Sequence, residues 1–182
     1  PPVAVDDSYG VRPGRTTVLR VTENDSDPDG DLLSASLLGE APAGFTITPV
    51  LGGAALQVAV AANAEGAASF RYQAEDGRGM DDDATVSLTV RAADQNEPPQ
   101  PKKAKTIQVE TGASVTYASL DDWKDPDGDE MFLTGATGDG GDVVSYRPNG
   151  VIEFTAASGV LGVKDVTLTV SPEMAPVPCA PL

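Results

Sequence analysis

The first half of the chain alternates apolar and polar side chains with a period of two residues. Alternation of this kind places every second side chain on one face of an extended strand, whereas a helix would need a spacing of three and four. The apolar or β-branched members of these runs are Thr17, Leu19 and Val21; Phe45 and Ile47; Leu56, Val58 and Val60; Phe70 and Tyr72; and Val86, Leu88 and Val90. With an opening strand near Val3–Val5 and another at Leu32–Leu38, they predict seven short strands.

Turn signals separate these runs. Arg12-Pro13-Gly14, Gly52-Gly53 and Asp76-Gly77-Arg78-Gly79 combine residues that fix or permit sharp backbone bends. Seven strands within about ninety residues are typical of an antiparallel β-sandwich with Greek-key connections. No stretch has a helical period, so the sequence predicts an all-β chain.

A second set of alternating runs follows residue 105. Its strands are expected at Thr106–Val109, Ser114–Ala118, Met131–Ala136, Val143–Tyr146, Val151–Phe154 and Val166–Val170. Nothing after Val170 resembles the Val86–Val90 run, and Ser171-Pro172 opens a proline-rich segment that cannot be a central strand. The sequence therefore predicts two tandem Greek-key sandwiches, the second without a clear final strand and with an exposed edge that could pair with another chain.

These patterns predict four segments. They are a seven-stranded sandwich at residues 1–95, a short linker with Pro and Lys at 96–105, a second and incomplete sandwich at 106–171, and a proline-rich tail at 172–182. The linker begins at Asn96-Glu97-Pro98-Pro99, where two prolines deny donors to a ladder and stiffen the path. The chain opens on Pro1-Pro2, and we expect it to be a piece of a longer protein.

Composition excludes several functions. The chain has 12 Lys and Arg against 28 Asp and Glu, a net charge of −16 and no histidine. Nucleic acid and anionic membranes are poor partners for so negative a surface, and the commonest general base is missing. The single cysteine, Cys179, has no partner for an internal disulfide, and no apolar run is long enough to span a bilayer. The acid pairs are not set in aromatic walls as in a glycosidase, so we expect no catalysis.

An acidic stretch, Asn24-Asp25-Ser26-Asp27-Pro28-Asp29-Gly30-Asp31, stands between two predicted strands and returns in shortened form as Asp125-Pro126-Asp127-Gly128-Asp129. Two such turns about a hundred residues apart indicate a duplicated unit. The first matches the D-x-D-x-D-G opening of a calcium loop, although Ser36 stands where the bidentate Glu is expected. An Asx turn, in which Asp side chains cap their own backbone, explains the same residues without a metal. The loop alone leaves both interpretations open.

Several phrases together resemble bacterial cadherin-like and immunoglobulin-like tandem repeats of long cell-surface proteins. They are AVDDSYGVRPGRTTVLRVTENDSDPDGDLL, SFRYQAEDGRG, ATVSLTV and ADQNEPP in the first half, and DWKDPDGDEM in the second. The resemblance implies seven-stranded modules that bind calcium where successive modules join. It implies that three places supply ligands. These are the acids of two loops at one end of a module, the linker, and acids at the opposite end of the preceding module, here called its foot. The residues in these places are Asp25, Asp27 and Asp76 in the loops, Asp94, Asn96 and Glu97 in the linker, and Asp7 and Glu65 near the foot.

The second module departs from this pattern because Trp123 takes the place of its first loop aspartate. Asp125 and Asp127 remain, with Asp129 and Glu130 as substitutes. The expected calcium site lies at the joint, with Asp7, Glu65, Asp94, Asn96, Glu97, Asp125 and Asp127 as ligands. Asp29 and Asp31 complete the candidate metal set.

These observations predict a non-catalytic pair of structural modules from a bacterial cell-surface or envelope protein, located outside the cell and with a joint stiffened by calcium. Two alternatives stay open. One is an adhesin module that binds a carbohydrate or protein through Trp123, Phe132 and Tyr146; the other is a spacer that binds no metal. The expected partners are neighbouring modules of the same chain and a surface protein or glycan, without nucleic acid and without insertion into a membrane.

Overall fold

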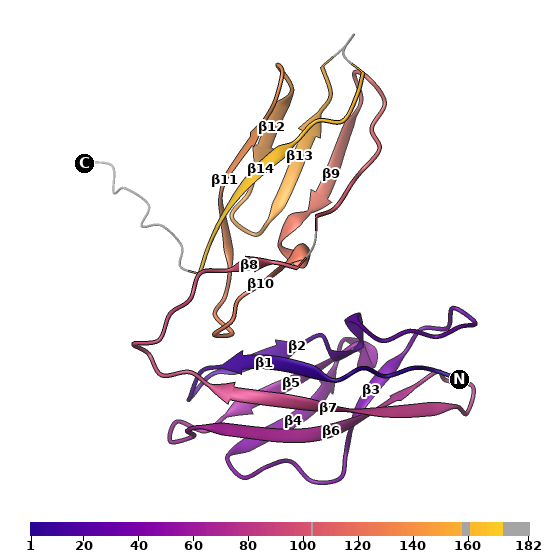
Figure 1. Cartoon of the computed structure of the whole chain (residues 1–182), viewed down its shortest axis with the longest axis vertical. Coiled ribbons are helices and arrows are strands. Elements are labelled where there is room, and N and C mark those ends of the chain that lie inside the picture. Colours follow the sequence, from indigo (N-terminus) through magenta and orange to yellow (C-terminus); the bar gives the residue numbers. More distant parts are fainter. Residues whose placement is uncertain (103, 158–160, 173–182) are drawn as a thin grey trace. The chain divides into compact units, whose positions relative to one another are not determined.

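The computed structural model describes residues 1–102, 104–157 and 161–172 (Figure 1). The chain divides into two compact units, Pro1–Asn96 and Glu97–Leu182. Both are built of strands joined by turns, and the helical segments in the described residues are three short 3₁₀ turns, η1 (Val21–Glu23), η2 (Leu51–Gly53) and η3 (Ser119–Asp122). The prediction of an all-β chain with tandem sandwiches is confirmed.

The first unit is a sandwich of seven strands. One sheet has the order β1-β7-β6-β3, made of β1 (Asp7–Val11), β7 (Asp81–Val90), β6 (Ala67–Glu75) and β3 (Ser34–Leu38). The other has the order β2-β5-β4, made of β2 (Thr16–Leu19), β5 (Ala55–Val60) and β4 (Phe45–Val50). β1 runs parallel to β7, and the other neighbouring strands are antiparallel.

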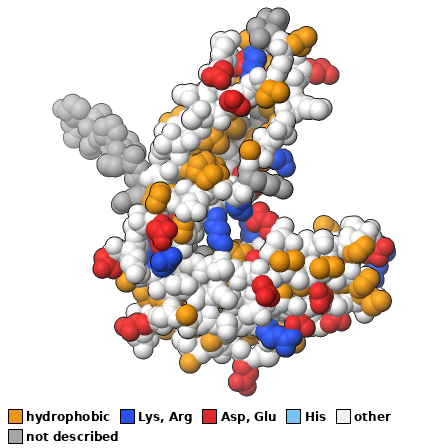
Figure 2. All heavy atoms as spheres, viewed as in Figure 1, with side chains coloured by type: hydrophobic (Ala, Val, Ile, Leu, Met, Phe, Trp, Pro, Cys, Tyr) orange, Lys and Arg blue, Asp and Glu red, His pale blue; other side chains and the backbone are white. Residues whose placement is uncertain are grey.

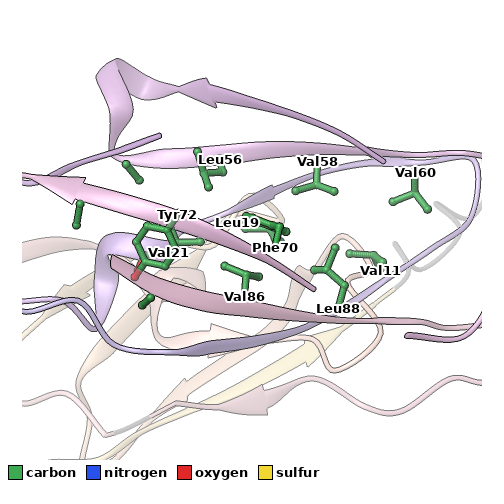
Figure 3. Close-up of a cluster of buried hydrophobic side chains, with 13 residues drawn as sticks. Val11, Leu19, Val21, Leu56, Val58, Val60, Phe70, Tyr72, Val86 and Leu88 are labelled. Carbon is green, nitrogen blue, oxygen red and sulfur yellow. The ribbon is translucent and has the colours of Figure 1, made fainter. Parts of the chain in front are cut away.

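The core of the first unit lies between these two sheets, as the alternation of β6 and β7 predicts. Phe70 and Tyr72 point inward from β6, and Val86 and Leu88 point inward from β7, each exposed by 4% or less (Figure 3). They meet buried residues from the facing sheet, among them Leu56 and others of β2 and β5. Burial of large apolar side chains on both faces supplies the main driving force for this unit.

The expected first strand at Val3–Val5 is wrong. Val3 forms only an isolated bridge with Ser26, and the ladder begins at Asp7. Val3 and Val5 are 47% and 42% exposed, so neither faces the core. Val11, at the end of β1, is fully buried and fixes the strand against β7.

The described residues of the second unit also form two sheets, with five strands between them. One pairs β11 (Phe132–Gly138) with β14 (Val166–Ser171), and the other has the order β12-β13-β9, made of β12 (Val143–Tyr146), β13 (Val151–Thr155) and β9 (Ser114–Ala118). A short ribbon pairs β8 (Gln100–Pro101) with β10 (Trp123–Lys124). This ribbon repeats the Val3–Ser26 bridge of the first unit. Its strand β8 falls inside the segment 96–105 predicted as linker, whereas β10 lies beyond it.

The expected strand at Thr106–Val109 is not formed. Its counterpart in the first unit is β1, which pairs with β7 and with no other strand. The part of the second unit that the structure describes holds no counterpart of β7. The segment therefore lacks the ladder that would make it a strand. The predicted tail at 172–182 lies outside the described residues apart from Pro172.

Candidate metal site

The two acidic loops share one turn geometry. Asp27 Oδ1 accepts hydrogen bonds from the N–H groups of Asp29 at 2.7 Å and Asp31 at 3.5 Å. Asp125 Oδ1 accepts in the same way from Asp127 at 2.9 Å and Asp129 at 3.1 Å. Each turn closes at a glycine, Gly30 or Gly128, whose φ of 77° or 75° lies in the left-handed region. The Asx turn predicted from the sequence is present in both loops.

The turn uses only one oxygen of each leading aspartate. Asp27 Oδ2 and Asp125 Oδ2 are both buried, and neither has a hydrogen-bond partner among the described residues. A buried carboxylate oxygen without a donor costs free energy unless a cation or water satisfies it. The turn and a metal site are therefore compatible in these loops.

Each loop belongs to a cluster of three carboxylates whose nearest oxygens lie within 4.8 Å of one another. The first acidic cluster is Asp27, Asp31 and Asp76; the second acidic cluster is Asp125, Asp127 and Asp129. The second cluster is the more enclosed, since Asp125 and Asp127 are exposed by only 6% and 0%. All these ligand atoms are carboxylate oxygens, which suit hard cations such as Ca²⁺ better than transition metals.

Asp127 is fully buried and contacts the linker. The N–H of Glu97 donates to Asp127 Oδ2 at 2.5 Å. Asp29, the equivalent residue of the first loop, is exposed. Burial raises the pKa of Asp125, the N–H donors of its turn oppose that shift, and the neighbouring carboxylates of Asp129 and Asp127 add to it. Holding these charges together is therefore unfavourable unless a positive ion joins them.

The first acidic cluster already has a positive partner. The guanidinium of Arg78 lies 2.9 Å from Asp31 Oδ1. Asp76 Oδ1 accepts from the N–H groups of Arg78 at 2.7 Å and Met80 at 3.1 Å, and these bonds hold the pKa of Asp76 below its ordinary value. This cluster has less need of a metal than the second.

Asp25 faces away from the first acidic cluster. Its carboxylate accepts from the Tyr72 hydroxyl at 2.9 and 3.0 Å and from the N–H of Val5 at 2.8 Å. Burial raises its pKa, and these hydrogen bonds oppose the shift. The structure therefore does not join Asp25 and Asp27 in one ligand set, although the resemblance pairs them.

The foot residues of the first unit are also separated. Asp7 pairs with Val86 midway along β7 and accepts from the Tyr9 hydroxyl at 3.4 Å. Glu65 is exposed and lies in the turn before Gly66, whose carbonyl accepts from the N–H of Val90 at the far end of β7. The structure therefore places Asp7 beside the middle of β7 and Glu65 near the end of that strand, and their joint ligation stays a prediction.

The linker oxygens of the first unit contact a cation that the chain itself supplies. Arg12 is 6% exposed, and its Nη1 donates to the carbonyls of Ala92 at 2.5 Å and Gln95 at 2.6 Å. Its Nη2 lies 3.4 Å from Asn96 Oδ1, while Asp94 is exposed. A guanidinium thus occupies the place of charge compensation that the sequence assigns to calcium.

Arg12 and Arg78 were not predicted from the sequence as parts of these sites. Both stand in turn signals, beside Pro13-Gly14 and between two glycines, which explain them as ordinary surface residues. Only their distance to acids and carbonyls in the folded chain shows their role.

Two successive Greek-key β-sandwiches define a tandem immunoglobulin-like protein. A family model described as a bacterial Ig domain matches residues 1–89 and again residues 96–174, so the chain belongs to the bacterial Ig domain family. Domains of this family are structural modules, generally non-catalytic, and they typically occur in extracellular surface proteins. No helix in the described part of the chain is long and apolar enough to cross a membrane.

Solved structures with similar folds come from several kinds of protein. An endo-fucoidan hydrolase of glycoside hydrolase family 107 is 18% identical, with a TM-score of 0.41; the match covers 94% of this chain and 32% of the hydrolase. The Ig1-2 module of the Drosophila receptor protein tyrosine phosphatase DLAR is 15% identical, with a TM-score of 0.35 and coverage of 86% and 84%. The EC3-6 structure of protocadherin gammaB7 is 17% identical, with a TM-score of 0.36 and coverage of 93% and 47%. At these values the neighbours say nothing about function, and no curated protein matches the sequence.

Proposed function

We propose that the two domains form a non-catalytic structural segment of a bacterial cell-surface or envelope protein and that the second acidic cluster binds calcium. One observation carries the metal proposal: Asp125 Oδ2 is buried without a hydrogen-bond donor, beside the fully buried Asp127. An isolated spacer loop would gain nothing from burying these two carboxylates together.

Asp125, Asp127 and Asp129 fit calcium through their ligand type. Ca²⁺ takes six to eight oxygen ligands in flexible geometry, and three carboxylates leave the remaining positions to carbonyls and water. Neutralising three crowded acids would stabilise the loop. Sites of extracellular modules often bind in the range of about 10⁻⁴–10⁻³ M, and this site belongs in that class.

Calcium at this cluster would act on the linker through Glu97. The N–H of Glu97 already bonds to Asp127, so an ion that orders Asp127 also orders the first residue of the second unit. Restricting the linker in this way would stiffen the segment, which is the mechanical role we propose. Four further residues stay predicted ligands: Asp94, Asn96, Asp7 and Glu65. Calcium titration of Asp94→Asn, Asn96→Ala, Asp7→Asn and Glu65→Gln can test them.

The metal-free spacer is the second candidate, and Arg12 favours it. Because that guanidinium satisfies linker oxygens of the first unit, part of the expected joint needs no ion. The adhesin alternative has less support. Trp123 and Phe132 are half-buried, and the hydroxyl of Tyr146 donates to the carbonyl of Thr134 at 2.7 Å.

Titration calorimetry with Ca²⁺ tests the proposal. The unmodified chain should bind one ion with Kd of about 10⁻⁴–10⁻³ M. Asp125→Asn keeps the turn acceptor but removes the charge, and it should weaken binding by about tenfold or more. Asp29→Asn is the matched control, because it makes the same change at an exposed position of the other loop. Absence of binding at millimolar calcium would leave the metal-free spacer.

A further inference from the structure

The segment that follows β7 is folded back on the first unit as far as Gln95. Val90, the last residue of β7, pairs with Val11, and the N–H of Arg91 donates to the carbonyl of Val11 at 2.8 Å. A turn then closes on itself. The N–H of Gln95 donates to the carbonyl of Ala92 at 3.0 Å, and the N–H of Ala92 donates to Gln95 Oε1 at 3.1 Å. The backbone therefore leaves the ladder without entering an extended tether.

Arg12 fixes this turn to the first unit. It follows the fully buried Val11 and is itself 6% exposed. Its Nη1 donates to the carbonyls of Ala92 and Gln95, and its Nη2 donates to Asn96 Oδ1 at 3.4 Å. A guanidinium presents several donors in one rigid plane, so a single side chain holds all three acceptors in fixed directions. The first unit therefore holds the chain up to the peptide group between Gln95 and Asn96.

The next residue, Glu97, is held by the second unit. Its N–H donates to Asp127 Oδ2 at 2.5 Å, and Asp127 is fully buried. Pro98 and Pro99 follow; their rings fix their own φ angles, and Pro98 restricts Glu97 to extended conformations. β8 then begins at Gln100 and pairs with β10. The second unit thus holds the chain from the N–H of Glu97 onward.

The two anchors lie on either side of one Cα atom. The carbonyl of Gln95 belongs to the peptide plane before Asn96, and the N–H of Glu97 belongs to the plane after it. Because peptide planes are rigid, only φ and ψ of Asn96 separate the two anchors. We infer that Asn96 is a single-residue hinge between the two units and that Arg12 keeps the hinge this short.

Loss of Arg12 would release the turn and lengthen the hinge to residues 91–96. Neither anchor needs a metal, since both are made by the chain itself, so the inference goes beyond the proposed calcium site. An ion at the second acidic cluster would strengthen the anchor at Asp127 and leave the anchor at Arg12 as it is.

Exposure and charge suggest the opposite, a tether extended by repulsion. Residues 92–98 are exposed, and the chain has a net charge of −16. The acidic side chains, however, are scattered over the face shown in Figure 2 and do not gather in one patch. Repulsion between exposed charges weakens with salt, whereas bonds to the buried Arg12 and Asp127 are screened much less. The two interpretations therefore differ in their response to salt and to the loss of Arg12.

¹⁵N relaxation of the whole chain, recorded with EDTA present, tests the inference. Order parameters are about 0.85 in rigid backbone and below about 0.6 in flexible backbone. In the unmodified chain, the amides of residues 91–97 should be as ordered as those of β7, at low salt and at about 0.5 M NaCl alike. Arg12→Met should lower the order parameters of residues 92–96 below about 0.6 and leave that of Glu97 unchanged.

The control is Arg147→Met, which makes the same change at an exposed position of the second unit and should leave residues 91–97 unchanged. If Arg12→Met does not fold, Arg12→Lys replaces it, because lysine keeps the charge but loses the planar fork and should also release residues 92–96. The values of the unmodified chain decide the first expectation whether or not a variant folds.

Two results would overturn the inference. One is a run of flexible amides within residues 91–97 of the unmodified chain. The other is a folded Arg12 variant whose residues 92–96 are as ordered as before. Because EDTA removes calcium, neither result bears on the proposed calcium site, which calorimetry tests separately.

Discussion

In the first unit, Phe70, Tyr72 and Ala74 along β6 are exposed by 4% or less, whereas Val166, Leu168 and Val170, in the same places on β14, are half-buried. The strand patterns are equally regular, and only the neighbours differ. β7 covers β6, and the described residues offer no such cover for β14. The comparison teaches that one covering strand can decide the burial of the strand beside it, since Leu133 of β11 in the same sheet stays buried. Among the described residues, the lack of such a strand also leaves the first strand of the unit without a ladder.

The two acidic loops differ in a similar way. Their Asx turns are the same, but Arg78 pairs with one carboxylate of the first cluster, whereas the second cluster is buried and accepts from the N–H of Glu97. Identical local sequence therefore gives one loop with an arginine partner and another whose leading carboxylates are buried, and only the second is our proposed calcium site. The following changes are ordered from the largest expected effect to the smallest.

The largest expected difference between the two units is the loss of stability on truncating a core leucine. Leu88→Ala removes a side chain that is 1% exposed and should lower the free energy of unfolding of the first unit by about 3–4 kcal/mol. Leu168→Ala, at the half-buried position of β14, should cost the second unit about 1 kcal/mol. Urea unfolding followed by far-UV circular dichroism and by the fluorescence of Trp123, the single tryptophan, distinguishes the units. Equal losses would show that the two cores are packed alike.

Removing the guanidinium of Arg12 should come next. Arg12→Met leaves the carbonyls of Ala92 and Gln95 without their donor and should cost the first unit about 2–3 kcal/mol. Limited proteolysis should then cut residues 91–96 faster, with no change in the Trp123 transition. Arg147→Met, which makes the same change at an exposed position of the second unit, is the control and should leave residues 91–96 as resistant as in the unmodified chain. A linker that stays resistant in Arg12→Met would contradict the role of this cation.

The two leading loop aspartates should differ only when calcium is present. Without the ion, Asp27→Ala and Asp125→Ala should each lose about 1 kcal/mol because the turn acceptor is gone. With 10 mM Ca²⁺, the unmodified second unit should gain about 1.4–2.7 kcal/mol. Asp125→Ala should abolish this gain, and Asp27→Ala should keep it. The measurement is thermal unfolding of the second unit followed by the fluorescence of Trp123. A gain that Asp27→Ala abolishes instead would place the ion in the first loop.

The smallest expected effect is the pH dependence of stability. The contribution of Asp25 to the first unit and that of Asp142 to the second should have opposite signs. Burial raises the pKa of Asp25 above 3.8, so its contribution to the first unit is present at low pH and is lost as pH rises through the raised value. The N–H of Ala157 and the ammonium of Lys164 lower the pKa of Asp142, so its contribution to the second unit is present above 3.8 and is lost as pH falls through the lowered value.

Stability measured against pH checks both signs. Relative to Asp25→Asn, the unmodified first unit should gain stability as pH falls from neutral towards about 4. Relative to Asp142→Asn, the second unit should lose stability below that point. Asp29→Asn corrects for the removal of one charge from a chain of net charge −16. If the curves of stability against pH run parallel for each variant and the unmodified chain, neither carboxylate contributes to the pH dependence.

The sequence predicted those strands in which one face packs into a core, because there apolar and polar side chains must alternate. The runs at Leu56–Val60 and Val86–Val90 lie in β5 and β7, because one side of each faces the opposite sheet. Thr106–Val109 has the same pattern and forms no strand, since a ladder depends on a partner far along the chain. The two-residue strands β8 and β10 are too short to show any period.

The candidate site was predicted only as far as local sequence determines it. The turns at Asp27 and Asp125 follow from Asp, Pro and Gly at fixed spacing. Which carboxylates lie together depends on tertiary structure. The Tyr72 hydroxyl donates to Asp25, and Asp7 pairs with Val86 midway along β7. The compensation of the linker by Arg12 also depends on the fold, because nothing near it in sequence marks a buried arginine.

The most direct test of calcium at the second acidic cluster is a ¹H–¹⁵N correlation spectrum recorded during titration with Ca²⁺. The account predicts saturable shifts of the amides of Glu97 and Asp125–Asp129, with the amides of Asp27–Asp31 unmoved until higher concentration. Shifts that follow exposed acids in general, such as Asp81–Asp83, and leave Glu97 unmoved would contradict it.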